Sequence, residues 1–198
     1  MSELDFSSVP TLEGRFVRLE PLQPGHVDDL RLASAEGDLW RKWTTGIPGP
    51  DEVEAEIARR LALHDEGQLA PWAICNAASG AAIGMTSFLH LDAPNRRLEI
   101  GSTWIARAAH GSPVNPEAKL LLLTRAFEDL DCIAVEFRTH WHNFQSRAAI
   151  AGLGAKQDGV LRSHSIGVDG TLRDTVVFSI TAAEWPTVRY GLRRRLEI

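Results

Sequence analysis

The chain has 198 residues, of which 44% are hydrophobic and 24% are charged, and its formal net charge is −5. This profile is typical of one globular domain covering residues 1–198 and excludes a disordered chain. The negative charge argues against a general nucleic-acid-binding protein and mildly favours a cationic substrate. The N-terminus, MSELDFSSVPTLEG, is acidic and polar, and no apolar run is long enough to cross a bilayer, so we expect a cytoplasmic protein.

The first half of the chain predicts a strand, two helices and three further strands. RFVRLEPL at 15–22 alternates as a strand does, whereas 24–37 and 50–67 have the apolar spacing of amphipathic helices and end at glycines. Three strand-like runs separated by SG and APN turn signals follow, and they indicate an antiparallel meander. These runs are PWAICNA, AAIGMTSFLHL and RRLEIGSTWIA.

The second half predicts two helices that alternate with strands, and then a hairpin. The helices cover about Pro116 to Leu130 and residues 143–154, and a strand, CIAVEFRTHW, lies between them. VDGT joins two final strands, GVLRSHSIG and LRDTVVFSI. The predicted order is β-αα-βββ-α-β-α-ββ, and the basic RYGLRRRLEI tail reads as a solvated helix face.

The two cysteines, Cys75 and Cys132, each lie in an apolar, strand-like run. Buried thiols in such runs behave as small hydrophobic side chains. We therefore expect two buried, reduced thiols without a chemical role, rather than a disulfide or a metal site.

The stretch AHGSPVNPEAKLLLLTRAFEDL, residues 109–130, begins the first helix of the second half. Asn115 is a suitable N-cap, and Pro116 then falls at the first helical position, where its missing N–H costs nothing. A well-capped helix with an apolar inner face explains the stretch without any ligand. The inner face would consist of Leu120, Leu123, Phe127 and Leu130.

The loop before this helix also has the features of a phosphate site. Gly111, Ser112, Val114 and Asn115 carry backbone N–H groups near the positive end of the helix dipole. Such a position binds phosphate groups. From the residues alone, the capped core helix and the anion site both remain open.

Four motifs in this order resemble the GNAT superfamily of acyl-CoA-dependent N-acetyltransferases, in the branch related to the ribosomal-protein N-terminal acetyltransferases. They are LEIGSTWI, GSPVNPEAKLLLLTRAFE, HNFQSRAAIAGLGAKQDGVLR and DGTLRDTVVFSI. The resemblance covers nearly the whole chain and implies an α/β (α+β) fold with a mixed, mostly antiparallel twisted sheet of about seven strands and helices on both faces. One departure is that Ala108 and Pro113 stand where the phosphate loop usually has a basic or amide residue and a second small residue.

The resemblance implies acetyl-CoA as cosubstrate. Its pyrophosphate would lie in the loop before the helix that Asn115, Pro116 and Glu117 start, and its pantetheine arm would bond to free backbone groups between LEIGSTWI and AVEFRTHW, where strands separate at a bulge. The implied coenzyme-binding residues are Ile100, Gly101, Ser102, Gly111, Ser112, Val114, Asn115, Asn143, Ser146 and Arg147.

Acetyl transfer to an amine needs a base, because an amine of pKa near 10 is protonated at neutral pH. The resemblance puts a carboxylate near the acetyl group, and Glu99 in RRLEIGS is the candidate. A backbone N–H around Gly101 or Ser102 is the expected donor to the developing oxyanion. The alternative is that Glu99 lies at an exposed strand start, paired with Arg96 or Arg97.

The departing thiolate needs a hydrogen-bond donor. In the related branch an Asn-x-x-Ser pair lies near the sulfur, and Asn143 and Ser146 occupy those positions here. Capping alone explains the same spacing, because an N-cap Asn143 accepts from the Ser146 N–H. Other branches of the superfamily use a tyrosine as this donor. The chain's one tyrosine, Tyr190, falls in the basic C-terminal helix, so Ser146 is the better candidate.

Histidines and tryptophans mark a candidate acceptor side. His140 and His142 lie two apart at a strand end and would point to the same side, yet no third metal ligand has suitable spacing. Trp40 and Trp43 lie between the first two helices, where the family's acceptor cleft is often lined; core packing is the alternative, above all for Trp40. We take Trp43 and His140 as candidate substrate-binding residues.

The sequence thus predicts an N-acetyltransferase that works by direct attack in a ternary complex, with Glu99, Asn143 and Ser146 as catalytic residues and no metal. The partner would be a primary amine, in a small molecule or at a protein N-terminus, with neither nucleic acid nor membrane involved and a homodimer left open. The alternative is an acyl-CoA-binding or regulatory module without catalytic activity.

Overall fold

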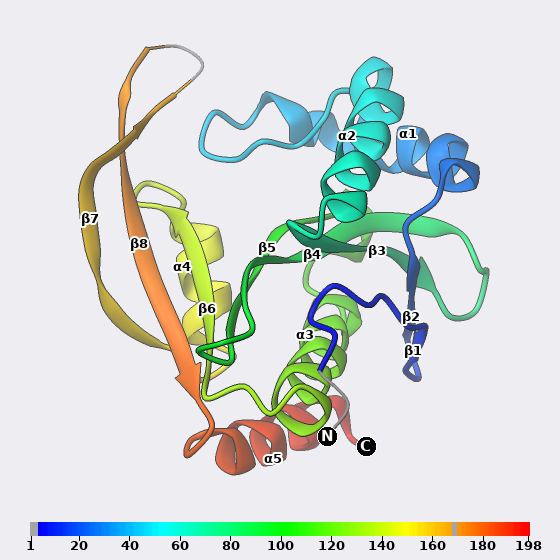
Figure 1. Ribbon diagram of the computed structural model, residues 1–198. Coiled ribbons are helices and arrows are strands. Elements are labelled where there is room, and N and C mark those ends of the chain that lie inside the picture. The colour runs from blue at the N-terminus through cyan, green and yellow to red at the C-terminus, as the bar shows by residue number, and fades with distance from the viewer. Residues whose placement is uncertain (1–3, 168–169) are drawn as a thin grey trace.

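One sheet of eight strands runs through the molecule, and the computed structural model describes residues 4–167 and 170–198 (Figure 1). Its order is β1-β2-β3-β4-β5-β6-β8-β7, and every neighbouring pair is antiparallel except β5 and β6. The strands are β1 Leu12–Glu13, β2 Val17–Pro21, β3 Leu69–Asn76, β4 Ala82–Asp92, β5 Arg97–Ile105, β6 Ala134–His140, β7 Lys156–Ile166 and β8 Leu172–Thr181.

Helices cover both faces of this sheet, as the resemblance implied (Figure 1). The α-helices are α1 Val27–Ala35, α2 Val53–Asp65, α3 Val114–Thr124, α4 Phe144–Ala151 and α5 Trp185–Leu196. Short 3-10 helices span Pro24–His26, Glu36–Arg41, Pro50–Glu52 and Arg107–Ala109, and a π-helix, Arg125–Asp129, continues α3.

The predicted element order is confirmed, with two additions at the ends. Seven strands become eight because the two-residue strand β1 turns back at Gly14 and pairs with β2. The tail is more than a solvated helix face: Arg193–Arg195 are exposed, but the opposite side of α5 is buried. That buried side consists of Trp185, Val188, Leu192 and Leu196.

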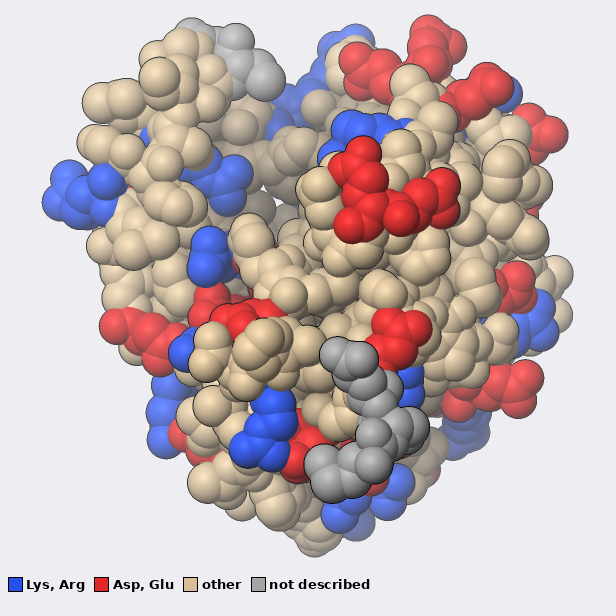
Figure 2. Space-filling model, viewed as in Figure 1, with Lys and Arg blue, Asp and Glu red and all other residues tan. Residues whose placement is uncertain are grey.

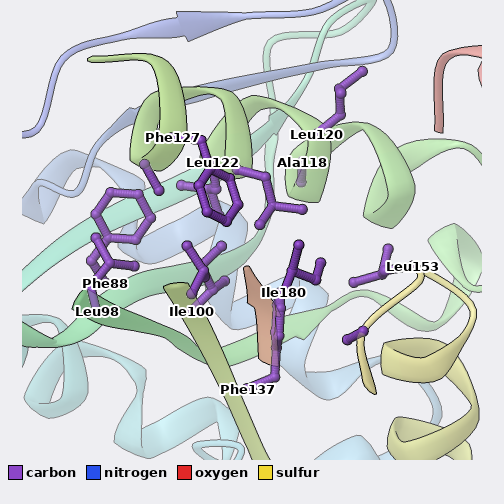
Figure 3. Packing of buried hydrophobic residues seen from close by; sticks show 14 of the residues in the cluster. Phe88, Leu98, Ile100, Ala118, Leu120, Leu122, Phe127, Phe137, Leu153 and Ile180 are labelled. Atoms are coloured by element: carbon purple, nitrogen blue, oxygen red, sulfur yellow. The ribbon is translucent and has the colours of Figure 1, made fainter. Parts of the chain in front are cut away.

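The core has two parts, one on each face of the sheet. The larger part joins the sheet to α3, α4 and α5; Figure 3 shows Leu122 of α3 and Phe127 of the following π-helix near Phe88, Leu98 and Ile100 of the sheet. The inward face predicted for α3 is confirmed, since its four named residues are all buried. The smaller part joins the sheet to α1 and α2, and contains Leu30, Val53, Ile57, Met85 and Trp104.

The alternation of β5 decides which of its side chains face each layer of helices. Leu98 and Ile100 belong to the larger core beside α3. Since successive side chains of a strand point to opposite faces, Glu99 and Gly101 face the side of α1 and α2. At this part of β5 the two faces therefore differ, with Leu98 and Ile100 on one and the carboxylate of Glu99 on the other.

Both cysteines are buried and unbonded to each other, as predicted. Burial raises the pKa of Cys75 to about 11 and that of Cys132 to about 12, so neither thiol ionises near neutral pH. Cys132 lies in the loop before β6 rather than in a strand. Of the predicted VDGT turn, residues 168 and 169 lie outside the described residues, but β7 and β8 pair as the predicted hairpin. None of the described helices is long and apolar enough to span a membrane.

Candidate active site

The strands β5 and β6 separate in the middle of the sheet. Their parallel pairing runs from Arg97 opposite Ala134 to Glu99 opposite Glu136 and goes no further, although β5 continues to Ile105 and β6 to His140. Figure 1 shows the two strands diverging beyond this point. From Ile100 onward, one backbone edge of β5 has no strand beside it, so it can bond an extended ligand.

A β-bulge lies in β5 at this opening. Met85 pairs with Trp104 and Ser87 with Gly101, so one residue of β4 opposes two of β5. Ser102 at the bulge has φ 47°, in the left-handed region. The predicted separation of strands at a bulge is confirmed.

Arg60 of α2 supports the bulge from one face of the sheet. Its guanidinium is almost completely buried, donates from Nη2 to the Ser102 carbonyl at 3.0 Å and from Nη1 to the Ser87 hydroxyl at 3.2 Å, and pairs with Glu56 at 2.7 Å. The paired carboxylate compensates part of the cost of burying the charge. Sequence analysis missed Arg60, because it reads as one polar position of an amphipathic helix.

Lys119 of α3 supports the same bulge from the other face. Its Nζ donates to the Thr103 hydroxyl at 2.7 Å, and that oxygen lies 2.7 Å from the Thr86 hydroxyl in β4. Only 6% of Lys119 is exposed, and burial alone lowers the pKa of its amine to about 7. Sequence analysis also missed Lys119, although a lysine before the apolar run LLLL was a visible signal.

The start of α3 differs from the prediction. The helix begins at Val114 with Pro113 at the N-cap, so Asn115 is not the cap and Pro116 is not the first helical residue. The Ser112 hydroxyl takes the capping role instead, since it accepts from the Val114 N–H at 3.3 Å and donates to a carbonyl of the preceding turn. The loop turns at Gly111, whose φ of 76° favours glycine.

Two of the four predicted loop donors have partners within the loop. The Ser112 N–H donates to the Ala109 carbonyl at 3.4 Å, and the Val114 N–H donates to the Ser112 hydroxyl at 3.3 Å. Within residues 4–167 and 170–198 we find no partner for the N–H of Gly111 or Asn115. These two donors, near the positive end of α3, are available to an anion.

Glu117 does not face this loop, although it lies in the first turn of α3. Its carboxylate is buried and accepts three backbone N–H groups, from Arg15, Phe16 and Val17, at 2.6 to 2.8 Å. A carboxylate satisfied in this way is held firmly. Glu117 therefore fastens the turn between β1 and β2 to α3.

Glu99 is buried at the point where β5 and β6 part, with 5% of its surface exposed. His90 Nδ1 lies 2.9 Å and Arg138 Nε 3.4 Å from its carboxylate. Burial raises the pKa of Glu99, with a further contribution from the charge of Glu136, while His90 and Arg138 oppose the rise. A buried carboxyl of raised pKa at an opening is a candidate acid or base.

The alternative that Glu99 pairs with a neighbouring arginine on an exposed strand start is wrong. Arg96 bonds Asp131 and Arg97 bonds Glu136, so neither reaches Glu99. Gly101 leaves room for the buried carboxylate, because a Cβ at this position would lie 2.6 Å from a Glu99 oxygen.

The predicted cap of α4 is confirmed. Asn143 is the N-cap, and its side-chain oxygen accepts from the Ser146 N–H at 3.0 Å. Ser146 is half-buried, on the first turn of α4. Arg147 lies against the ring of Trp141, 4.3 Å from its centroid, and donates to the Trp141 carbonyl at 3.1 Å.

An aromatic group lies beyond the end of β6. Trp43 is 64% exposed, and its ring centroid is 4.8 Å from that of His140 and 5.7 Å from that of His142. His140 is buried, its Nδ1 accepts from the His142 N–H at 3.0 Å, and the two rings lie on the same side as predicted. Core packing is wrong for both tryptophans, since Trp40 is also 39% exposed, beneath Arg41.

One group of three metal-ligand side chains occurs within the described residues, away from this opening: Glu20, His26 and Cys75. His26 Nδ1 accepts from the Gln23 N–H at 3.3 Å, and its Nε2 lies 3.5 Å from Glu20. Both ring nitrogens therefore already have polar neighbours, and the His26 side chain joins the Pro24–His26 turn to Glu20 of β2.

Comparison with known proteins identifies the family of this chain. The sequence profile of the acetyltransferase (GNAT) domain matches residues 17–156. A Bacillus subtilis (strain 168) protein named "Putative ribosomal N-acetyltransferase YdaF" is 35% identical over 106 residues, which are 54% of this chain and 57% of that protein. The match thus spans little more than half the length of this curated relative.

Solved structures share the fold over almost the full chain. A GCN5-related N-acetyltransferase from Brucella melitensis has a TM-score of 0.86 and 30% identity, covering 94% of this chain and 85% of that one. Mycobacterium smegmatis RimJ in complex with CoA-disulfide has the same fold at 23% identity, with a TM-score of 0.74 and coverage of 94% and 93%. The domain match, the parted β5 and β6 and these structures agree, and the chain belongs to the GNAT family of acetyltransferases.

Proposed function

We propose that the protein transfers the acetyl group of acetyl-CoA to a primary amine, by direct attack of the amine in a ternary complex. The observation that carries this proposal is the position of Glu99, a buried carboxyl of raised pKa at the point where β5 and β6 part. An amine that enters from the side of α1 and α2 would meet a thioester held along β5 at this point. Glu99 would then lie beside the attacking amine as its base.

The coenzyme would bind through backbone groups. Its pyrophosphate would lie over Gly111 to Asn115, where two N–H groups and the α3 dipole converge. Its pantetheine arm would follow the unpaired edge of β5 at Ile100, Gly101 and Ser102. Acetyl-CoA supplies the thioester that is attacked.

The chain's own groups would manage charge and protons. Glu99 takes the proton that the amine loses, directly or through water. A backbone N–H near Gly101 or Ser102, on the bulge supported by Arg60 and Lys119, stabilises the developing oxygen charge. Ser146, with Asn143 ordering the first turn of α4, donates to the departing sulfur.

The acceptor would enter between the α1–α2 side and the β6–β8 side. Trp43 and His140, which touch edge to face, would flank it. A contact between Lys42 Nζ and Gln145 Oε1, at 3.1 Å, joins the two borders of this entrance. The acceptor amine belongs either to a small molecule or to a protein N-terminus.

Release of free thiol from acetyl-CoA in the presence of an amine panel tests the function. The panel comprises amino acids, polyamines, aminoglycosides and peptides with free N-termini. Both cysteines are buried, so a thiol reagent reports coenzyme A rather than the folded protein. We expect amine-dependent release by at least one class. Tight acetyl-CoA binding without release by any amine would show a non-catalytic acyl-CoA-binding module instead.

A further inference from the structure

The face of the sheet that carries Glu99 also carries two arginines from the strands beside it. Glu99 lies opposite Glu136, and Arg138 is two residues further along β6. Arg138 lies opposite Val177 of β8, and Arg173 is four residues from Val177, so it shares the same face. Figure 2 shows a hollow between the β6–β8 side and the α1–α2 side, with lysine or arginine atoms on both borders.

Three other arginines near this opening have carboxylate partners. Arg138 pairs with Glu136 at 3.0 Å and with Glu99 at 3.4 Å. Across the hollow, Arg59 and Arg60 of α2 share Glu56. Their charges are therefore largely compensated within the protein.

Arg173 differs from these arginines. No carboxylate lies within 4 Å of it in the described ranges, and its Nε is buried without a hydrogen-bond partner there. Burial lowers the pKa of Arg173, and the charge of Glu99 is what opposes this change. An unsatisfied N–H on a half-buried cation is costly, and an anionic acceptor would compensate the charge while it bonds the guanidinium.

We propose that the acceptor carries a carboxylate near its amine and that Arg173 binds this carboxylate while Glu99 receives the amine. The proposal rests on the acetyl transfer proposed above. The amine would lie at the base of the opening, and the carboxylate on the side of the end of β6, since Arg173 is two residues beyond Thr175, the partner of His140. The shared chemistry is a carboxylate, from a free amino acid or from an acidic residue of a peptide.

The charges around the hollow disfavour a polycationic acceptor. A cavity of about 220 Å³ between α2 and the sheet is lined by Arg59, Arg60 and His90, together with Ser87 and Ser102. Because carboxylates compensate Arg59, Arg60 and Arg138, the positive charge left over at the opening is that of Arg173, in a protein whose net charge is −5. The local field, not the net charge, acts on a small ligand, so the charge-based expectation of a cationic substrate does not extend to this site.

The test compares acceptors that differ only in the carboxylate. L-serine is paired with L-serinamide, and a peptide beginning Ser-Asp with one beginning Ser-Asn. In at least one pair we expect the wild-type kcat/KM to be 10-fold higher or more for the carboxylate member, about 1.4 kcal/mol. Arg173→Gln should abolish this preference by raising KM with kcat kept, and Arg173→Lys should restore part of it. The pair that shows the preference tells whether the bound carboxylate belongs to a free amino acid or to a peptide.

Arg162 provides the matched control on the neighbouring strand. It is exposed, and it pairs with Asp174 at 2.6 Å outside the opening. Arg162→Gln should keep the wild-type preference. Equal kcat/KM for both members of each pair in the wild type, or an unchanged preference in Arg173→Gln, would overturn the assignment.

Binding of the acetylated products gives a readout that does not need turnover. With coenzyme A present, N-acetyl-L-serine or the N-acetylated Ser-Asp peptide should raise Tm more than its amide counterpart, and Arg173→Gln should remove the difference. If no amine releases thiol but this difference appears, the acetyl transfer fails and the carboxylate site stands. If thiol is released but the amide members bind and react equally well, the acetyl transfer stands and the carboxylate site at Arg173 fails.

Discussion

The two faces of the sheet at the opening between β5 and β6 use different chemistry. On the face of α3 the donors are backbone N–H groups at Gly111 and Asn115 and one buried amine, Lys119, without a carboxylate beside it. On the face of α2 the groups are side chains, and Arg60 and Glu99 each have oppositely charged partners. Under the proposed function, the backbone N–H groups would bind the phosphates that every acyl-CoA carries, whereas the side chains would act on the acceptor amine.

The difference in charge pairing has a direct consequence for the two buried cations. Burial lowers the pKa of both, but Glu56 opposes the change at Arg60, while no group among the described residues opposes it at Lys119. The same bulge is thus held by a permanent charge on one face and by an amine that titrates near neutrality on the other.

Glu99→Gln should cause the largest effect, because it removes the proposed base from the acceptor face alone. We expect kcat to fall by about 10³-fold, within the range for a positioned general base, with coenzyme A affinity unchanged. Because the pKa of Glu99 is raised, wild-type kcat/KM should begin to fall at a higher pH than an ordinary carboxyl would give. Steady-state kinetics across pH and calorimetry measure both quantities.

Glu136→Gln is the matched control on the paired strand. Removing its negative charge should lower the pKa of Glu99 and move the acidic limb to lower pH, with the plateau rate largely kept. A wild-type rate in Glu99→Gln across neutral pH would assign the proton to another group, with His140 next to be tested.

Ser146→Ala separates catalysis from capping at α4. If the hydroxyl donates to the departing sulfur, turnover should fall by about 10²-fold with Tm and coenzyme A affinity nearly unchanged. Asn143→Ala should instead lower stability by about 1 kcal/mol, because its side chain is the cap. Full activity of Ser146→Ala on a verified acceptor would leave thiolate protonation to water.

Lys119→Met examines the buried amine. In the unfolded chain a lysine stays protonated up to its ordinary pKa of about 10.4, whereas in the fold the pKa is about 7, so the unfolded state binds more protons between these values. Because of Lys119, the wild-type free energy of unfolding should therefore rise by about 2 kcal/mol from pH 7 to pH 9. This rise should be absent from Lys119→Met. Urea unfolding at several pH values measures it.

Lys156→Met is the control for this pH dependence, since Lys156 is exposed and its partner Glu184 raises rather than lowers its pKa. Lys156→Met should therefore show the same rise in unfolding free energy from pH 7 to pH 9 as the wild type. Identical pH profiles for wild type and Lys119→Met would contradict a lowered pKa at Lys119.

Gly111→Val should have a modest effect, on the coenzyme face. A Cβ at Gly111 would meet nothing within 4 Å, so the cost comes from its φ of 76°, which a β-branched residue adopts poorly. We expect coenzyme A affinity to weaken by about 10-fold, roughly 1.4 kcal/mol. Unchanged affinity in calorimetry, with the fold intact, would place the pyrophosphate elsewhere.

The sequence by itself determined features that depend on neighbours along the chain. Asn143 caps α4 because its oxygen reaches an N–H three residues ahead, a distance that helix geometry sets. Leu98 and Ile100 face the core while Glu99 faces the opening, because strands alternate. The order of motifs also identified the family and hence the opening between β5 and β6.

Only the tertiary structure decided which distant groups meet at the site. Arg60 reaches the carbonyl of Ser102, 42 residues away, and Arg173 meets the field of Glu99 from β8. The start of α3 at Val114 rather than at the expected cap depends on how the Ser112 loop folds back. No spacing rule predicts such contacts, because they depend on how strands far apart in sequence are placed side by side, and burial then decides which charges persist.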